Sequence, residues 1–222
     1  MQNFGTPAAI VTLLAVPAGR IRLVAAERAD TTVEILPADA SRSRDVKTAE
    51  QTEVTYADGV LRIEVPKPAN GSSLGDTGSI EVTVQLPVGS RVEAEAAATE
   101  LHAVGRLGDV AFQGAYHQIK IDEAARLTLT ATDGDIEVGR ITGSAEITTA
   151  RGDIRIAEAT GGTLALTTQK GDITVGAATG VSAVLDAGTA YGRVTNSLKN
   201  DGTPGLNIRA TTAYGDIAAR SI

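Results

Sequence analysis

The sequence contains no cysteine and no tryptophan, and its aromatic residues are four tyrosines and two phenylalanines among 222 residues. Without cysteine the chain can form no disulfide, thiolate zinc site or iron–sulfur cluster, and it offers no cysteine nucleophile. Because 24 glycines accompany this shortage of bulky side chains, we expect a thin core and many turns. The length allows one sizeable domain or two small ones.

Positive charge is also scarce, because 20 lysines and arginines face 27 acidic residues, for a formal net charge of -7. Nucleic-acid binding depends on clustered Lys and Arg that neutralise phosphates, so we expect no nucleic-acid partner. The sequence also has no phosphate-binding loop ending in Gly-Lys-Ser/Thr and no Gly-x-Gly-x-x-Gly after a strand. We predict a protein that is not an enzyme and needs no cofactor.

An apolar run near the N-terminus, Ala8 to Val16, resembles the core of a signal peptide. No Lys or Arg precedes Arg20, however, and Pro7 interrupts the approach to the run. Pro17 to Gly19 followed by alternating apolar residues fits a turn between two strands better. The run is far shorter than the ~20 apolar residues that a membrane-spanning helix needs. We therefore expect no membrane span and a cytoplasmic protein, with export to the cell surface as the alternative.

A repeat of about nine residues begins near position 134 and is marked by glycine. The glycines are 9, 9, 9, 10, 9 and 12 residues apart, at Gly134, Gly143, Gly152, Gly161, Gly171, Gly180 and Gly192. Segments that open Gly-Asp-Ile alternate with segments that open with Gly and a small residue, so the unit is a pair of about 18 residues. Gly215-Asp216-Ile217 restates the opening after a longer insertion.

Within each Gly-Asp segment the apolar residues alternate with polar ones, as in Ile136 and Val138 around Glu137. This period of two predicts half-buried strands, with glycine at the corners that join them. An all-β, solenoid-like stack of paired nine-residue strands explains why two kinds of segment alternate, since like would lie on like. An antiparallel meander or sandwich remains the alternative.

The chain divides by pattern into two regions. We expect residues 98–222 to form the strand-repeat region and residues 1–97 to form a non-repetitive β region that caps one end of it. The strands expected in the cap are 31–36, 53–56, 60–65 and 80–86. A helical turn is expected within 38–50, and a loop over 66–75.

An aspartate follows the corner glycine in alternate segments, at Asp135, Asp153 and Asp172, and again at Asp216. A stack of carboxylates needs compensation, either by calcium or by backbone N–H groups. We favour turns in which each carboxylate accepts from N–H groups of its own corner, with a calcium ladder on Asp135, Asp153 and Asp172 as the weaker alternative. The turn positions expected to be structural are Gly134, Asp135, Gly152, Asp153, Gly171, Asp172, Gly192, Gly215 and Asp216.

Few other residues suggest a site. Tyr191 and Tyr214 each precede a corner glycine, so we expect their rings to stack on one edge. Packing at the corner is the favoured interpretation, with a small exposed surface for interaction as the alternative. Arg151-Gly152-Asp153 spells an integrin-binding tripeptide, which repetition of the corner explains. His102 and His117 are the only histidines, and their spacing matches no metal site.

Several segments resemble the bacterial "putative adhesin" domain-of-unknown-function family of β-strand-repeat proteins. They are Phe4 to Pro7, Ile80 to Ser90, the Gly-Asp-Ile segments, Leu185 to Leu198, which is the most specific, and Ala213 to Ile217. The resemblance spans nearly the whole chain. It implies an all-β, solenoid-like fold and implies no enzyme activity and no site residues.

These observations predict a non-enzymatic structural or interaction protein that presents repetitive faces to an unknown protein partner or to itself. Self-association would use strand edges, and the last coil near Ile222 is expected to be the open edge. A secreted or cell-surface adhesin is one alternative. A carbohydrate-active β-helix enzyme is another, disfavoured because the repeats carry few aromatic side chains for stacking on sugars.

Overall fold

A computed structural model describes residues 1–66, 77–114 and 118–222. Its internal contacts divide the chain into two units, Met1–Tyr116 and His117–Ile222. This division differs from the expected boundary after residue 97. The reason is that β9 (Ala98–Gly114) pairs in parallel with β3 and β8 and therefore belongs to the first unit.

The first unit contains nine strands and one helix among its described residues. They are β1 (Gln2–Gly5), β2 (Val11–Ala15), β3 (Ala18–Ala26), β4 (Asp30–Pro37), α1 (Ser43–Gln51), β5 (Glu53–Ala57), β6 (Val60–Glu64), β7 (Ile80–Pro87), β8 (Arg91–Ala96) and β9. Strand β2 lies between β6 and β8, and β3 lies between β7 and β9, with all four pairings parallel. Antiparallel pairs β1–β4, β4–β7 and β5–β6 complete the unit.

The expected strands of this unit are present. The apolar run forms β2, and Leu14 and Val16 are buried in the core, as the strand–turn–strand interpretation predicts. The expected helical turn is longer, a nine-residue helix anchored by the buried carboxylate of Asp45, which accepts from the N–H of Ser79 at 3.0 Å. The loop expected over 66–75 lies almost entirely outside the described residues.

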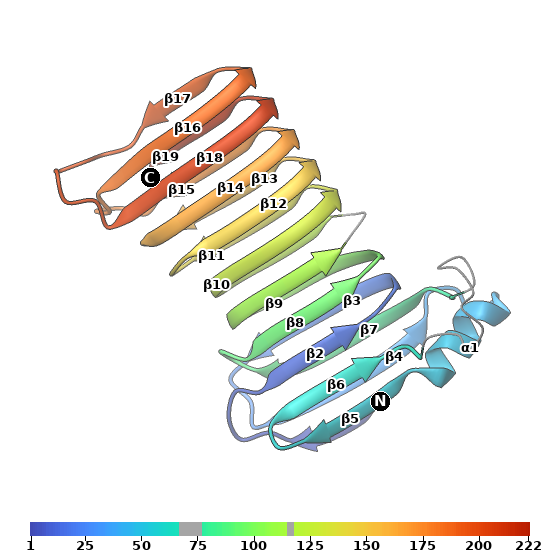
Figure 1. Ribbon diagram of the computed structural model, residues 1–222. Helices are drawn as coiled ribbons and strands as arrows, with labels where there is room; N and C mark the ends of the chain where they lie inside the picture. The colour runs from blue at the N-terminus through green and yellow to red at the C-terminus, as the bar shows by residue number, and fades with distance from the viewer. Residues whose placement is uncertain (67–76, 115–117) are drawn as a thin grey trace. The chain divides into compact units, whose positions relative to one another are not determined.

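The second unit consists of two layers of parallel strands, and each coil of the chain contributes one strand to each layer (Figure 1). Its strands are β10 (Ile119–Asp133), β11 (Ile136–Ile141), β12 (Ala145–Arg151), β13 (Ile154–Ala159), β14 (Gly162–Lys170), β15 (Ile173–Ala177), β16 (Ala183–Tyr191), β17 (Val194–Ser197), β18 (Leu206–Tyr214) and β19 (Ile217–Ser221). Strand β11 pairs with β13, β12 with β14 and β13 with β15, so these strands stack on the next but one, while the long β10 pairs with both β11 and β12. This pairing confirms the solenoid-like fold and excludes the antiparallel alternative for this unit.

Equivalent side chains stack in register inside the second unit. Ile136 lies beside Ile154, Ile154 beside Ile173, and Ile173 beside Ile217, and all four are at most 1% exposed. Leu164 and Ile208 form the matching column of the other sheet. The branched side chains fill the narrow space between the sheets, which explains why the sequence uses few aromatics.

The last two strands do not lie at the end of the stack. Strand β18 lies between β14 and β16, and β19 lies between β15 and β17, so the C-terminal coil is inserted between two coils formed earlier in the chain (Figure 1). The expectation that the coil near Ile222 forms the open edge is therefore wrong. The chain forms β16 and β17 first and then places β18 and β19 between them and the earlier coil. Strands β16 and β17 are therefore the outermost strands at this end of the second unit.

Candidate binding surfaces

The Gly-Asp corners form a ladder of hydrogen bonds between coils. The N–H of Asp153 donates to the Asp135 carboxylate, that of Asp172 to Asp153, and that of Asp216 to Asp172, at 2.8 to 2.9 Å. The N–H of Arg193 donates to Asp216 at the last step. Backbone N–H groups thus compensate the carboxylates, but each belongs to the next coil and not to the aspartate's own corner as expected. The difference arises because stacking brings the next coil within hydrogen-bond distance.

The corner glycines leave no room for a side chain. A Cβ atom built at Gly152 would lie 2.2 Å from the carbonyl oxygen of Gly134, and one at Gly171 would lie 2.1 Å from that of Gly152. Both glycines also have φ above +120°, which L side chains rarely adopt. Buried threonines seal the same corners, since the hydroxyl of Thr168 donates to the carbonyl of Gly152 and that of Thr212 to Gly171. These glycines and threonines therefore serve the packing of one coil on the next.

The aspartates at the corners take part in hydrogen bonds with backbone N–H groups and in ion pairs. Within the described residues, no group of three or more His, Asp or Glu side chains is arranged to hold a metal ion. Arg151 of the Arg-Gly-Asp tripeptide forms an ion pair with Asp133 at 3.2 Å, and Asp153 pairs with Arg155 at 2.8 Å. His102 lies in β9, and His117 lies outside the described residues.

Tyr191 and Tyr214 stack as the sequence suggests. Their ring centroids are 4.8 Å apart and the ring planes differ by 4°. Both side chains are largely exposed, at 67% for Tyr191 and 55% for Tyr214. The pair therefore presents an exposed aromatic surface beside the last corner of the stack.

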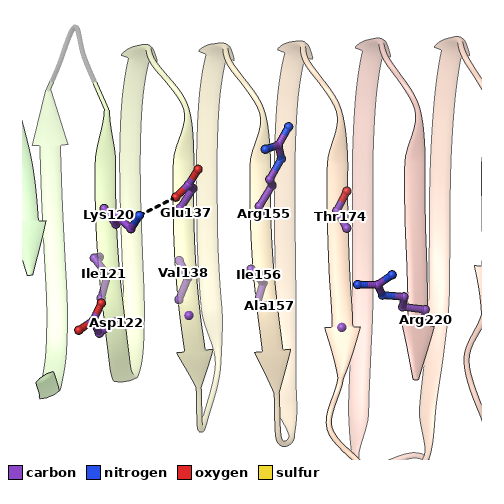
Figure 2. Close-up of a pocket in the computed structure, with 12 residues that line it drawn as sticks. Lys120, Ile121, Asp122, Glu137, Val138, Arg155, Ile156, Ala157, Thr174 and Arg220 are labelled. Carbon is purple, nitrogen blue, oxygen red and sulfur yellow. Dashed lines mark ion pairs between the residues drawn. The ribbon is translucent and has the colours of Figure 1, made fainter. Parts of the chain in front are cut away.

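A shallow groove of about 320 Å³ runs across the outer face of β11, β13 and β15. Its lining includes Gly139, Ala157 and Gly176, one small residue from each strand; Figure 2 labels Ala157 among the lining residues. Gly139 and Gly176 each pass so close to a carbonyl of the neighbouring strand that a Cβ would lie within 2.5 Å of it. Small residues there keep the outer surface hollowed.

Charged side chains surround this groove. Lys120 and Glu137 form an ion pair at 3.3 Å, drawn as a dashed line in Figure 2, and Arg155 is held by Asp153. The side chain of Arg220, on β19 at one end of the groove, is exposed and forms no ion pair or hydrogen bond within the described part of the chain. It is therefore a cation available to an acidic group of a ligand.

The sequence interpretation missed this groove, although a signal for it exists. Gly139, Ala157 and Gly176 each lie five positions after a corner glycine, where the neighbouring repeats carry a small residue. Stacking turns that repeated position into a column. Arg220 lies at the same position after Gly215, but the sequence did not show that its strand would stack directly beside Gly176, because the C-terminal coil is inserted.

Parallel strands that stack coil on coil around a thin aliphatic core place the protein among β-solenoid-like repeat proteins. A family model described as Toastrack DUF4097 matches residues 14–221, which is nearly the whole chain, so the protein belongs to this family. The resemblance to a domain-of-unknown-function family of "putative adhesin" proteins is confirmed.

Solved structures match this chain at low sequence identity. A crystal structure described as a "putative adhesin" from Bacteroides fragilis is 16% identical with a TM-score of 0.57, covering 98% of this chain and 95% of that one. A "putative cell adhesion protein" from Clostridium sporogenes is 14% identical with a TM-score of 0.37, covering 100% and 98%. The first similarity supports the fold and nothing further. No match to the sequence was found among curated proteins.

The described residues contain no helix that is both long enough and apolar enough to cross a membrane.

Proposed function

We propose that this protein is a non-catalytic, adhesin-like binding module, exported from the cell, that holds a partner protein in the groove across β11, β13 and β15. The family and the descriptions of its structural neighbours support an adhesin-like role, and with it export in place of the expected cytoplasmic location. The observation that carries the choice of surface is the groove, whose small-residue floor and charged rim lie on a rigid stack.

Arg220 points to the chemistry of the partner. Of the three cationic side chains that line the groove, Lys120 is paired with Glu137 and Arg155 with Asp153, whereas Arg220 has no ion-pair partner among the described residues. A carboxylate of the partner would gain a charge-assisted hydrogen bond there without breaking an existing ion pair.

A binding experiment tests the groove. Beads coated with purified protein are added to bacterial or animal cells, and adhesion is counted for the wild type, for Arg220→Glu and for Arg62→Glu. Arg62 is exposed on β6 of the first unit, so its substitution changes the net charge equally without touching the groove. We expect Arg220→Glu to lower adhesion and Arg62→Glu to leave it unchanged. Equal adhesion of all three proteins would contradict the assignment of the groove.

Localisation is tested separately. Protease added to intact producing cells should digest this protein while a cytoplasmic marker survives. Survival of both proteins until the cells are lysed would contradict export.

A further inference from the structure

The outermost strands of the second unit, β16 and β17, each have a strand neighbour on one side only. Within the described residues β16 pairs with β18 alone, and β17 pairs with β19 alone. Each therefore presents a row of backbone N–H and C=O groups with no strand partner, except at the start of β16, where the N–H of Ala183 donates to the carbonyl of Lys199 in the loop after β17. Such an edge is a template for pairing with another chain.

The hydrophobic core is also open at this end. Ile208 and Ile217 on the inserted coil are 2% and 1% exposed. Their register partners on the last coil are Leu185, which is half-buried, and Val194, which is 46% exposed. A partner that adds strands to both sheets would bury these apolar side chains as well as pair the backbone groups.

The two edge strands themselves carry few of the side chains that keep edges apart. Strand β16 carries a single charged residue, Asp186, which already faces Arg209 at 3.5 Å, and β17 carries none. Neither strand contains lysine or proline, the residues that commonly block edge pairing. The edge is therefore chemically suited to pairing.

We propose that this end is a self-association surface, and that a second copy of the chain pairs with it about a two-fold axis. A second copy offers what the edge lacks, namely two neighbouring strands that add to both sheets at once and bring exposed apolar side chains. The proposal is independent of the groove and of the cellular location.

The end of the aspartate ladder argues for a closed dimer over a growing filament. Each earlier coil offers a carboxylate to the N–H of the next, but the last coil has Arg193 in place of aspartate, with a side chain 89% exposed. A further coil stacked in the same way would meet a guanidinium, which cannot accept its N–H. A two-fold arrangement needs no such continuation.

Strand lengths select the pairing. Strand β16 has nine residues and β17 has four, so pairing like with like matches strands of equal length, whereas pairing β16 with β17 does not. A two-fold axis makes this pairing antiparallel. Centred on Ala187, it puts Asp186 opposite Gly188 and Val184 opposite Ala190 of the second copy, with no like charges facing.

Molar mass measured by light scattering over a concentration series tests the proposal. We expect the wild type to shift from monomer to dimer and no further. The variant V184K/A190K, which places ammonium groups opposite one another, should raise the dimer Kd at least about tenfold. The control T163K/T167K adds the same charge at two exposed positions of β14 and should dimerise like the wild type.

Two further measurements remove the ambiguity of misfolding. Mixing V184K/A190K with V184E/A190E should restore a dimer, which unfolded variants cannot do. Because the chain has no cysteine, Ala187→Cys supplies a unique thiol that should form an intermolecular disulfide, while Thr167→Cys should not. A wild type that stays monomeric at high concentration, a mass above the dimer, or dimers insensitive to V184K/A190K would each overturn the proposal.

Discussion

The backbone N–H of Asp216 donates a hydrogen bond of 2.8 Å to the carboxylate of Asp172, 44 residues earlier in the chain. This contact places the C-terminal coil directly on the coil that begins at Gly171. The chain forms β16 and β17 in between, and these strands end up outside the coil that closes the fold. The order of coils in space thus differs from their order in sequence.

The carboxylate ladder predicts a stability effect of about 1 kcal/mol at each step, the net value of a typical hydrogen bond. Asp172→Ala removes the acceptor for Asp216 and should lower the free energy of unfolding by that amount, while Asp172→Asn should retain most of it. Urea denaturation measures the difference. Asp186→Ala, at an exposed position outside the ladder, is the control and should change stability less.

Gly171 should tolerate no side chain. Gly171→Ala puts a Cβ 2.1 Å from the Gly152 carbonyl at a φ of 153°, so we expect a loss of several kcal/mol or failure to fold. A Cβ atom built at Gly188 would meet no atom within 4 Å, so Gly188→Ala should change the free energy of unfolding by no more than about 0.5 kcal/mol. Thermal unfolding followed by circular dichroism compares them. Equal melting temperatures would contradict the close approach of the coils.

Deletion of residues 206–222 should disorder more than the deleted segment. The deletion removes β18 and β19, the only described strand neighbours of β16 and β17. Hydrogen exchange should show loss of amide protection over 183–197, with protection retained over 136–141. Protection retained at 183–197 would mean that the last coil can stack on β14 and β15 without the inserted one.

Asp201 predicts a pH dependence in the loop that joins β17 to β18. Hydrogen bonding with Ser182 and with the N–H and hydroxyl of Thr203 lowers the pKa of Asp201 to about 2. Because the folded pKa lies below the unfolded one, the stabilisation is complete above the ordinary pKa and is lost as pH falls toward 2. Asp201→Asn should therefore reduce stability at pH 6 and match the wild type near pH 2. A difference that grows on acidification would have the wrong sign.

Thr12 is expected to reduce the stability of the first unit. Its hydroxyl is fully buried between Leu61 and Val92 and has no hydrogen-bond partner among the described residues. Thr12→Val keeps the shape and removes the unsatisfied group, so the free energy of unfolding should rise by about 1 kcal/mol. Thr12→Ser keeps the hydroxyl and should give no gain. Chemical denaturation of the three proteins provides the comparison.

Local chemistry made the strands and corners predictable. Alternation of apolar and polar residues after Gly134, Gly152 and Gly171 marks strands because side chains on a strand alternate between the two faces. The stacked pair of Tyr191 and Tyr214 followed from their equal positions before a glycine. The groove was not predicted, although Gly139, Ala157 and Gly176 mark its floor at one repeated position; the neighbour that adds Arg220 to it depends on the order of the coils.

The sequence by itself determined the coil: its strands, its glycine corners, its thin aliphatic core and its membership of a strand-repeat family. Only the tertiary structure decided the order of the coils. Similar coils fit one another in the same register, so repetition alone does not say which of them lie side by side. The sequence carried one cue, since Asp216 continues the carboxylate ladder from Asp172 and Arg193 ends it. That choice left β16 and β17 as the open edge and brought Arg220 to the groove.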